Sequence, residues 1–264
     1  GRFVVFRSHA TNLVPGDTNA AGDIFVRDRQ TGSTTRVSVD GTGTQSNGAS
    51  SEPAVTADGR FVAFRSTASN LVSGDTNGAN DVFLRDTQTG STTRVSVTGA
   101  GAQANGASYE PSVSDDGQLI AFRSHATNLV SGDTNATDDI FLRDSLSGTT
   151  EIVSADGSGA EGNGFSGVPA VSAGGAYVAF RSLASSLVTG DTNAAADVFL
   201  RHRATGTIVR VSVDSGGGQA SGASDFPALT ADGRTVFHSA ASNLVSGDTN
   251  GATDTFVHQL GDAD

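Results

Sequence analysis

Internal repetition constrains the fold of this chain more than any other sequence feature. The tetrapeptide Gly-Asp-Thr-Asn occurs five times, and successive copies begin 58 residues apart except for the last interval, which is 57. The copies begin at Gly16, Gly74, Gly132, Gly190 and Gly247. A fixed period of this length is typical of a chain built from repeated supersecondary units. The repeats are predicted at residues 1–58, 59–116, 117–174 and 175–232 with a partial copy at 233–264, all within one domain.

Each repeat contains four segments typical of β-strands. In the second repeat these inner, second, third and outer segments are Pro53–Asp58, Arg60–Ser66, Asp81–Asp86 and Thr92–Val97. The second and third segments (FVAF, VFL) are apolar at consecutive positions, so both faces of the sheet must be covered there. The inner segment is made of small residues and the outer one alternates polar with apolar residues. This gradient predicts an all-β fold, a β-propeller with five blades of four antiparallel strands; six blades are the alternative.

The lengths of the connections predict where function lies. Asp58-Gly59 and Asp86–Gly90 are tight turns, whereas Ser66–Asn80 and Thr98–Glu110 are long loops. Because antiparallel strands alternate in direction, both long loops fall at the same end of each sheet. Surface function is expected at this end, because long loops carry binding residues more often than tight turns do. The aspartates of the repeated loop predict that this face is acidic.

The repeat resembles a known family. The sequence PAVTADGRFVAFRS followed by DVFLRDTQTGSTTRVSV is similar to the β-propeller repeats of the TolB type, sometimes grouped as WD-like repeats. The similarity rests on the turns P-x-x-S/T-x-D-G and D-x-x-T-G and covers essentially the whole chain. It implies the fold rather than a function, since such repeats occur in periplasmic Tol-Pal components, in peptidase propellers and in many secreted proteins. The chain lacks the inner-strand Trp often found in that pattern and adds the long Gly-Asp-Thr-Asn loop.

The Gly-Asp-Thr-Asn loops are candidate calcium sites. Each supplies Asp, Asn and a second Asp at relative positions 1, 3 and 7, which are oxygen ligands of the kind that calcium takes from a single loop. Position 5 is never acidic and position 12 is never Glu, so the loops are not EF-hands. The candidate ligands are Asp17, Asn19, Asp23, Asp75, Asn77, Asp81, Asp133, Asn135, Asp139, Asp191, Asn193, Asp197, Asp248, Asn250 and Asp254.

A metal-free alternative explains the same loops. In it, the first Asp and the Asn form local turns, and the second Asp pairs with the Arg that ends the second strand. The expected ion pairs are Arg7–Asp23, Arg65–Asp81, Arg123–Asp139 and Arg181–Asp197.

Signals for catalysis are weak. The histidines His9, His125, His202, His238 and His258 are scattered over the repeats, and no G-x-S-x-G elbow marks a serine nucleophile. Glu52 and Glu110 precede the inner-strand Pro in two repeats and could form a carboxylate pair for glycoside hydrolysis, but Val168 and Phe226 replace them elsewhere. We therefore predict a protein that is not an enzyme; a polysaccharide-active propeller, glycosidase or lyase, is the alternative.

Composition narrows the partners. A formal net charge of −12 argues against nucleic-acid binding, and no apolar run is long enough to span a membrane. The chain has no Met, so Gly1 is not an initiator, and we expect a processed or partial chain that is secreted, at the cell surface or periplasmic. The expected partner is a protein or a larger surface assembly.

The order of the segments predicts open sheet edges. The chain begins at a second segment and ends after a third, so an outer and an inner segment are expected before Gly1 to close a five-bladed ring. Without them, the edges of the first and last sheets can pair with another chain.

Overall fold

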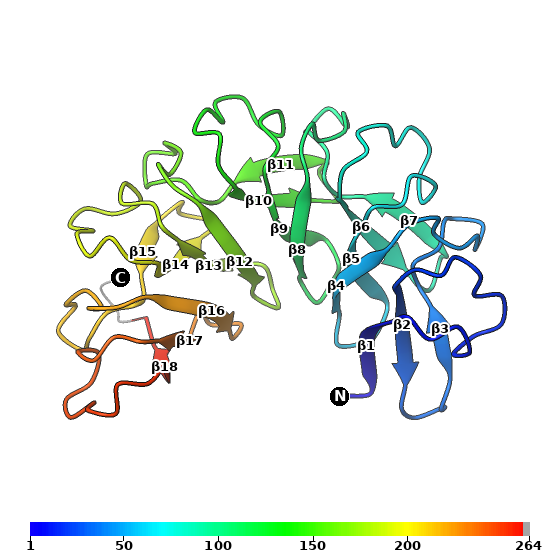
Figure 1. Cartoon of the computed structure of the whole chain (residues 1–264). Coiled ribbons are helices and arrows are strands. Elements are labelled where there is room, and N and C mark those ends of the chain that lie inside the picture. Colours follow the sequence, from blue (N-terminus) through cyan, green and yellow to red (C-terminus); the bar gives the residue numbers. More distant parts are fainter. Residues whose placement is uncertain (261–264) are drawn as a thin grey trace. The chain divides into compact units, whose positions relative to one another are not determined.

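The computed structural model describes residues 1–260, which form eighteen strands and no helix. These strands make five antiparallel sheets that follow one another along the chain (Figure 1). The chain divides into two compact units, Gly1–Ser131 with Leu142–Glu151, and Gly132–Phe141 with the chain from Ile152 onward. Within the described residues there is no helix long and apolar enough to cross a membrane.

Within every sheet the strands lie in chain order. The first sheet consists of β1 (Phe3–Ser8), β2 (Asp23–Asp28) and β3 (Thr34–Arg36). The second consists of β4 (Ser50–Val55), β5 (Phe61–Ser66), β6 (Asp81–Asp86) and β7 (Ser91–Arg94). The third consists of β8 (Ser108–Val113), β9 (Leu119–Ser124), β10 (Asp139–Asp144) and β11 (Thr149–Ile152). The fourth consists of β12 (Ser166–Val171), β13 (Tyr177–Ser182), β14 (Asp197–His202) and β15 (Ile208–Arg210). The fifth consists of β16 (Ser224–Leu229), β17 (Thr235–Ser239) and β18 (Asp254–His258).

The four segments predicted in the second repeat are confirmed as strands β4 to β7, and the third segment matches β6 residue for residue. In the described residues the first sheet has no inner strand and the fifth has no outer strand, as the segment order predicts. Three sheets have four strands and two have three, so the prediction of five four-stranded blades holds only in part.

The inner strands start earlier than predicted, and each contains a β-bulge. In β4 the register with β5 shifts between Ser51 and Ala54, and Glu52 inside the bulge has a φ of 52°. Pro53 follows it, and a residue before proline is disfavoured in the right-handed helical region. The equivalent residues Glu110, Val168 and Phe226 have φ values of 52°, 54° and 52°. One backbone conformation therefore carries four side chains, of three different types.

The outer strands end earlier than predicted, where a buried serine side chain takes over the pairing with the third strand. After β7, the Ser96 hydroxyl is fully buried and donates a hydrogen bond to Asp81 Oδ1 at 2.5 Å. The amide of Val82 donates to Ser96 Oγ at 3.2 Å, a bond that takes the place of the regular ladder. Val97 then forms an isolated bridge with Gln103. The chain around Asp81 is thus shaped by side-chain hydrogen bonds that alternation of residue types does not reveal.

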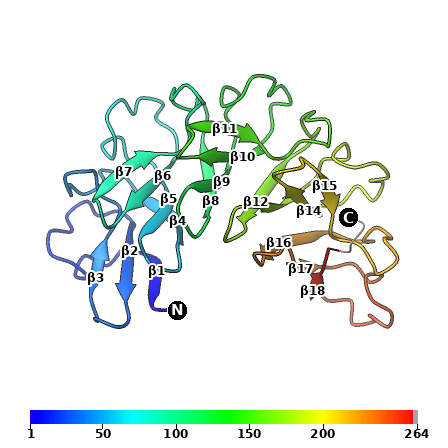
Figure 2. The same ribbon diagram turned by 180° about the vertical axis from the view of Figure 1, so that it is seen from behind.

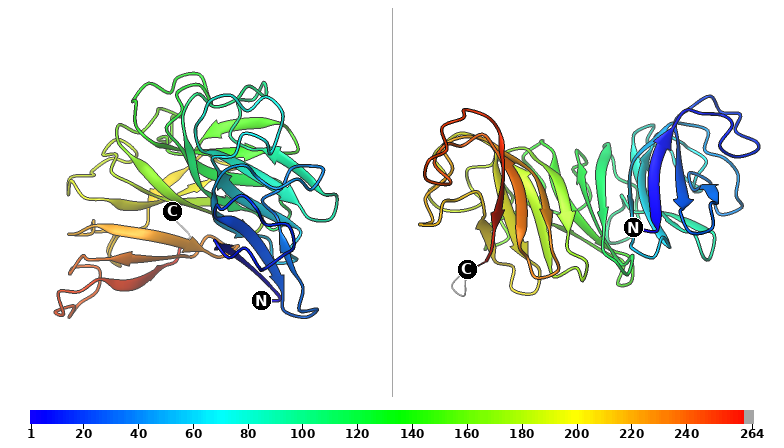
Figure 3. Two further views of the ribbon diagram at one scale, coloured as in Figure 1. Left: turned by 45° about the vertical axis from the view of Figure 1, so that its right-hand side comes forward. Right: turned by 90° about the horizontal axis from the view of Figure 1, so that it is seen from below.

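The core lies between the faces of successive sheets. In the first unit, Ile24 and Val26 of β2 belong to one buried cluster with Val62 and Phe64 of β5. Figure 2 shows the first and second sheets side by side in this unit. In the second unit, a cluster joins Val198 of β14 to neighbours in the fifth sheet, which lies next to the fourth (Figure 3). Coverage of both faces is what the consecutive apolar residues predict.

Candidate cation site

The Gly-Asp-Thr-Asn loop of the first sheet closes around a buried aspartate. Asp23, at the start of β2, is fully buried and accepts hydrogen bonds at both carboxylate oxygens. Its Oδ1 accepts from Ser38 Oγ at 2.6 Å and Ser46 Oγ at 3.0 Å. Its Oδ2 accepts from Asn19 Nδ2 at 3.1 Å and Gln45 Nε2 at 3.0 Å. Gln45 comes from the other long loop, so the two long loops meet at one end of the sheet, as predicted.

An arginine lies beside the two aspartates of this loop and balances their charge, and a glutamine donates hydrogen bonds to both. Arg36 on β3 lies 3.5 Å from Asp17 and 3.7 Å from Asp23. Gln45 Nε2 also donates to Asp17 Oδ1 at 2.8 Å, so one amide group joins both carboxylates. We call Asp17, Asn19, Asp23, Arg36 and Gln45, together with the equivalent sets in other sheets, the aspartate cradles.

The cradles of the second and fourth sheets have the same chemistry. In the second sheet, Arg94 lies 3.8 Å from both Asp75 and Asp81. Gln103 there donates to each of these carboxylates at 2.9 Å. In the fourth sheet, Arg210 lies 3.5 Å from Asp191 and 3.8 Å from Asp197, and Gln219 again donates to both. In each of these cradles, therefore, the positive charge beside the two carboxylates comes from an arginine side chain.

The predicted ion pairs Arg7–Asp23, Arg65–Asp81, Arg123–Asp139 and Arg181–Asp197 are wrong. In the first sheet Asp23 lies opposite Ser8, whereas Arg7 lies opposite Ile24. Consecutive residues of a strand point to opposite faces, so Arg7 and Asp23 point away from one another. The second-strand arginines contact other groups instead: Arg7 contacts His9, Arg65 pairs with Glu52, Arg123 with Glu110 and Arg181 with Asp225.

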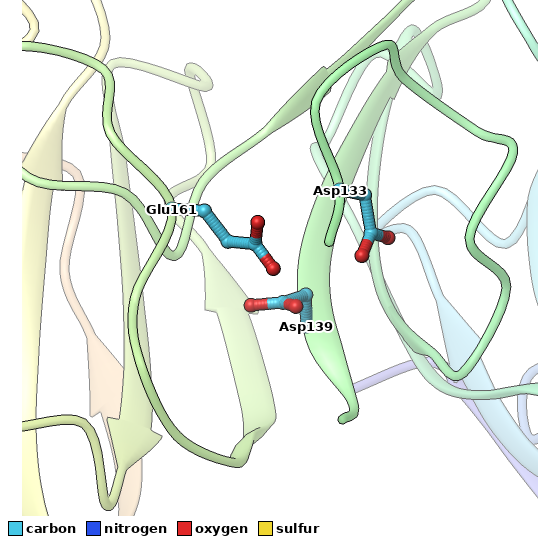
Figure 4. Close-up of side chains that lie close together, drawn as sticks. All are labelled: Asp133, Asp139 and Glu161. Carbon is cyan, nitrogen blue, oxygen red and sulfur yellow. The ribbon is translucent and has the colours of Figure 1, made fainter. Parts of the chain in front are cut away.

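The cradle of the third sheet differs from the others. Ile152 on β11 stands at the position of the arginine, and Glu161 stands at the position of the glutamine. Figure 4 shows Asp133 on its loop, Asp139 on the strand and Glu161 on a neighbouring loop, with the three carboxylates facing a common region. One oxygen from each carboxylate lies within 4.8 Å of the others. Relative to the other cradles, the two exchanges remove one positive charge and add one negative charge.

Backbone and side-chain donors fix two of these carboxylates. Glu161 accepts from the amides of Thr134 at 2.8 Å and Asn135 at 2.7 Å. Asp139 accepts from Ser154 Oγ at 2.6 Å and from Asn135 Nδ2 at 2.8 Å. The Oδ1 atom of Asn135 accepts from the amide of Thr137 at 2.7 Å. Asn135 therefore positions the loop and the carboxylates rather than offering its oxygen to an ion.

The pKa of Asp139 is raised to about 6, chiefly by burial. The hydrogen bonds from Ser154 and Asn135 oppose this rise, and the neighbouring charges of Asp133 and Glu161 add to it. Burial also raises the pKa of Asp81, but the charge of Arg94 opposes that rise. Asp139 therefore holds its negative charge less readily than Asp81, which has Arg94 beside it.

The arrangement has the chemistry of a cation site. Calcium takes oxygen ligands at about 2.3 to 2.6 Å, so two ligands on opposite sides of one ion lie about 5 Å apart. The three carboxylates fall within that span. Of the predicted ligands, Asp133 and Asp139 are brought together here. Glu161 was not predicted; the signal for it was present, because Gln45, Gln103 and Gln219 hold its position in the other repeats.

The loop of the fifth sheet is less complete. Asn250 Nδ2 donates to Asp254 at 3.0 Å, as in the other loops. Asp254 is only partly buried, in contrast to Asp23 and Asp197. Within residues 1–260 the fifth sheet has no outer strand to bring an arginine or a glutamine to these carboxylates.

The glutamates considered for catalysis are engaged in ion pairs. Glu52 lies 3.4 Å from Arg65 and Glu110 lies 3.2 Å from Arg123. Both guanidinium groups also lie over the ring of Tyr109, at 5.2 and 4.5 Å. The histidines make local contacts, such as the 4.9 Å ring contact of His202 with Tyr177 and the 5.9 Å contact of His238 with Phe226.

No protein-family model matches the chain, and a search of curated proteins finds no match. Solved structures do match. TolB from Acinetobacter baumannii has a TM-score of 0.50 at 16% identity, over 92% of this chain and 50% of its own. Dipeptidyl peptidase 4 from Porphyromonas gingivalis has a TM-score of 0.51 at 14% identity, over 97% of this chain and 37% of its own. An oligogalacturonate lyase from Vibrio parahaemolyticus has a TM-score of 0.51 at 12% identity, over 98% of this chain and 63% of its own.

These similarities identify the fold class: the chain is an all-β protein similar in fold to TolB-like β-propellers, with five sheets of three or four strands. It spans half the length of the TolB structure. Because peptidases and a lyase are as similar as TolB, the fold does not decide whether the chain is an enzyme.

Proposed function

We propose that the chain is a non-catalytic β-propeller of the TolB type, serving as a protein-interaction or scaffold module of a surface assembly. We also propose that its third cradle binds a divalent cation, with calcium as the first candidate. Its proposed location is secreted, at the cell surface or periplasmic. One observation carries the cation site: among four cradles with an outer strand, only the third exchanges Arg for Ile152 and Gln for Glu161.

The exchange has a simple electrostatic meaning. In the other cradles the guanidinium group lies within 4 Å of two carboxylates, and a glutamine amide donates to both. Ile152 offers no charge and Glu161 no donor, so Asp133, Asp139 and Glu161 repel one another. A bound calcium ion supplies two positive charges where the others have an arginine, and it prefers carboxylate oxygens. Both exchanges thus favour the same ligand.

The ion pairs of Glu52 and Glu110 support a non-catalytic role. An acid–base pair for glycoside hydrolysis needs one protonated and one ionised carboxyl group. Glu52 and Glu110 do not differ in this way, because each lies in the same kind of ion pair with an arginine. Release of products from oligogalacturonate or related polysaccharides by the purified chain would overturn this part of the proposal.

The cation site is tested by thermal unfolding in chelator and in millimolar calcium. We expect calcium to raise the melting temperature of the unmodified chain. The double variant Ile152→Arg/Glu161→Gln rebuilds the cradle of the other sheets, so it should lose the calcium response and melt higher in chelator than the unmodified chain.

A reciprocal variant serves as the matched control. Arg94→Ile/Gln103→Glu converts the second cradle into the third, so we expect a second calcium equivalent by calorimetric titration. If the unmodified chain melts at the same temperature in calcium and in chelator, and calorimetry detects no binding, the cation site is wrong.

A further inference from the structure

The edge strand of the fifth sheet has an unusual exposed residue. Val257 of β18 is 62% exposed. Its equivalents on the third strands of the other sheets are almost completely buried: Val26 at 8%, Leu84 at 7%, Leu142 at 1% and Leu200 at 1%. Those equivalents pack on the following sheet, as Val26 does with Val62 and Phe64. Their strands also pair with an outer strand, whereas in the described part of the chain no strand pairs with the far side of β18 (Figure 1).

A groove runs along this edge. It has a volume of about 480 Å³, and its apolar walls include Phe237, Leu244, Phe256 and Val257. All of these residues belong to the second unit. In the fourth sheet the outer strand β15 pairs along the corresponding edge of the third strand β14. The groove therefore has the position and the apolar character of an outer-strand site.

The polar groups of the groove match those that receive an outer strand elsewhere. Thr92 at the start of the second outer strand donates its hydroxyl to the Val39 carbonyl of the preceding sheet at 2.7 Å. Thr150 donates to the Val97 carbonyl in the same way at 2.7 Å. Val213 is the equivalent residue of the fourth sheet, and it lines the groove. The rim thus presents the residue whose carbonyl accepts a threonine in other repeats.

The charge at the end of the groove specifies one more residue. Asp248 and Asp254 belong to the loop that in other sheets receives an arginine of the outer strand, as Arg94 lies 3.8 Å from Asp75 and Asp81. Both are only partly buried. An incoming arginine would bury and neutralise these two carboxylates, and an incoming serine two residues later would reach Asp254 as Ser96 reaches Asp81 at 2.5 Å.

We propose that the edge of β18 binds an extended polypeptide segment with the sequence pattern Thr-x-Arg-Val-Ser, which adds to the fifth sheet as its outer strand. Backbone pairing supplies affinity, as in other cases of strand addition. The threonine, arginine, valine and serine set the register, because each has a matching group on the groove. This recognition does not depend on a cation in the third cradle.

The probe is a fluorescent peptide with the sequence of residues 91–105, which contains Thr92, Arg94, Val95, Ser96 and Gln103. We expect saturable one-to-one binding by fluorescence anisotropy. The peptide with Arg94→Ile should bind at least about tenfold more weakly, because both aspartates then lose their partner. The peptide with Val95→Asp should not bind.

Variants of the protein distinguish specific binding in the groove from nonspecific binding of the peptide. Val257→Asp places a charge in the groove at an exposed position, so the chain should fold with an unchanged melting temperature and lose peptide binding. Leu146→Asp, at another exposed apolar residue outside the groove (78% exposed), should bind the peptide normally. Peptide binding that Val257→Asp leaves unchanged, or no binding up to millimolar peptide, would overturn the proposal. So would a dimer that Val257→Asp abolishes and the peptide does not displace, since the groove then binds a second copy.

Discussion

Ile152 on β11 holds the repeat position of Arg94 on β7, whose guanidinium group lies 3.8 Å from both Asp75 and Asp81. The same fold therefore contains cradles with an arginine at this position and one with an isoleucine. The comparison is internal to one chain, so the backbone is nearly constant and the difference comes from two side chains.

Removal of the arginine from the second cradle should be costly. Asp81 is fully buried, and Arg94→Ile would leave its charge beside Asp75 without compensation. We expect a loss of about 2 to 3 kcal/mol in unfolding free energy at pH 7, measured in urea. Arg27→Ile, which removes an exposed arginine that donates to Thr34, is the control. A loss below about 0.5 kcal/mol for Arg94→Ile would contradict the role of the arginine.

Calcium binding should weaken in acid because protons compete with the ion. The pKa of Asp139 is raised to about 6, so lowering the pH through about 6 protonates a proposed ligand and should reduce calcium affinity in calorimetric titrations. Without calcium, in chelator, the stability of the fold should change in the opposite direction. The raised pKa of Asp139 stabilises the folded chain at low pH, and this stabilisation is lost as the pH rises through about 6. Asp139→Asn should remove both effects. An affinity that is constant from pH 7 to pH 5 would contradict the assignment of Asp139.

Asp86 should stabilise the second sheet in a pH-dependent way. Its carboxylate pairs with Arg60 at 2.8 Å and accepts from the amide of Gln88 at 2.9 Å, which holds the turn between β6 and β7. These contacts, with the Arg60 hydrogen bond foremost, lower its pKa to about 2. Asp86→Asn should cost about 1 to 2 kcal/mol at pH 7.

The pH profile provides the check on Asp86. A lowered pKa contributes stability that is present above the unfolded value and is lost as the pH falls through about 2. The difference between the unmodified chain and Asp86→Asn should therefore shrink steadily in acid. Asp115→Asn, at an exposed aspartate, should show no such trend.

Gly59 should tolerate substitution less well than Gly74, although both have positive φ, 74° and 73°. A Cβ at Gly59 would collide with the ring of Phe3 on the neighbouring sheet, whereas a Cβ at Gly74 would meet nothing within 4 Å. We expect Gly74→Ala to cost about 1 kcal/mol and Gly59→Ala about 3 kcal/mol in urea unfolding. Equal losses would show that the ring of Phe3 moves aside without cost.

The period of 58 residues and the consecutive apolar segments were sufficient to predict the sheets and the coverage of both faces. The arginine partners of the aspartates could not be predicted, because they depend on which face of a strand each side chain takes. Arg7 is close to Asp23 in strand order, but a one-residue offset in register separates the two side chains.

The cation site was predicted in part. The loops drew attention to Asp133 and Asp139, but Glu161 lies far along the chain in a loop that reads as polar and unspecific. The role of Glu161 follows only from the structure, in which Gln45 at the same repeat position donates to both Asp17 and Asp23. At that point the change from amide to carboxylate removes two donors and adds a ligand. The identity of the ion and of any protein partner stays a prediction.

The bulge that places Glu52 at a φ of 52° separates backbone geometry from side-chain identity. Pro53 and the bulge define the local conformation, so the side chain before the proline is free to vary, and the four copies carry Glu52, Glu110, Val168 and Phe226. Phe226 is largely exposed, whereas Glu52 and Glu110 pair with arginines. Each repeat can thus change its chemistry at this point without altering its neighbours, which makes the inner strand the natural place for such a chain to acquire new specificities.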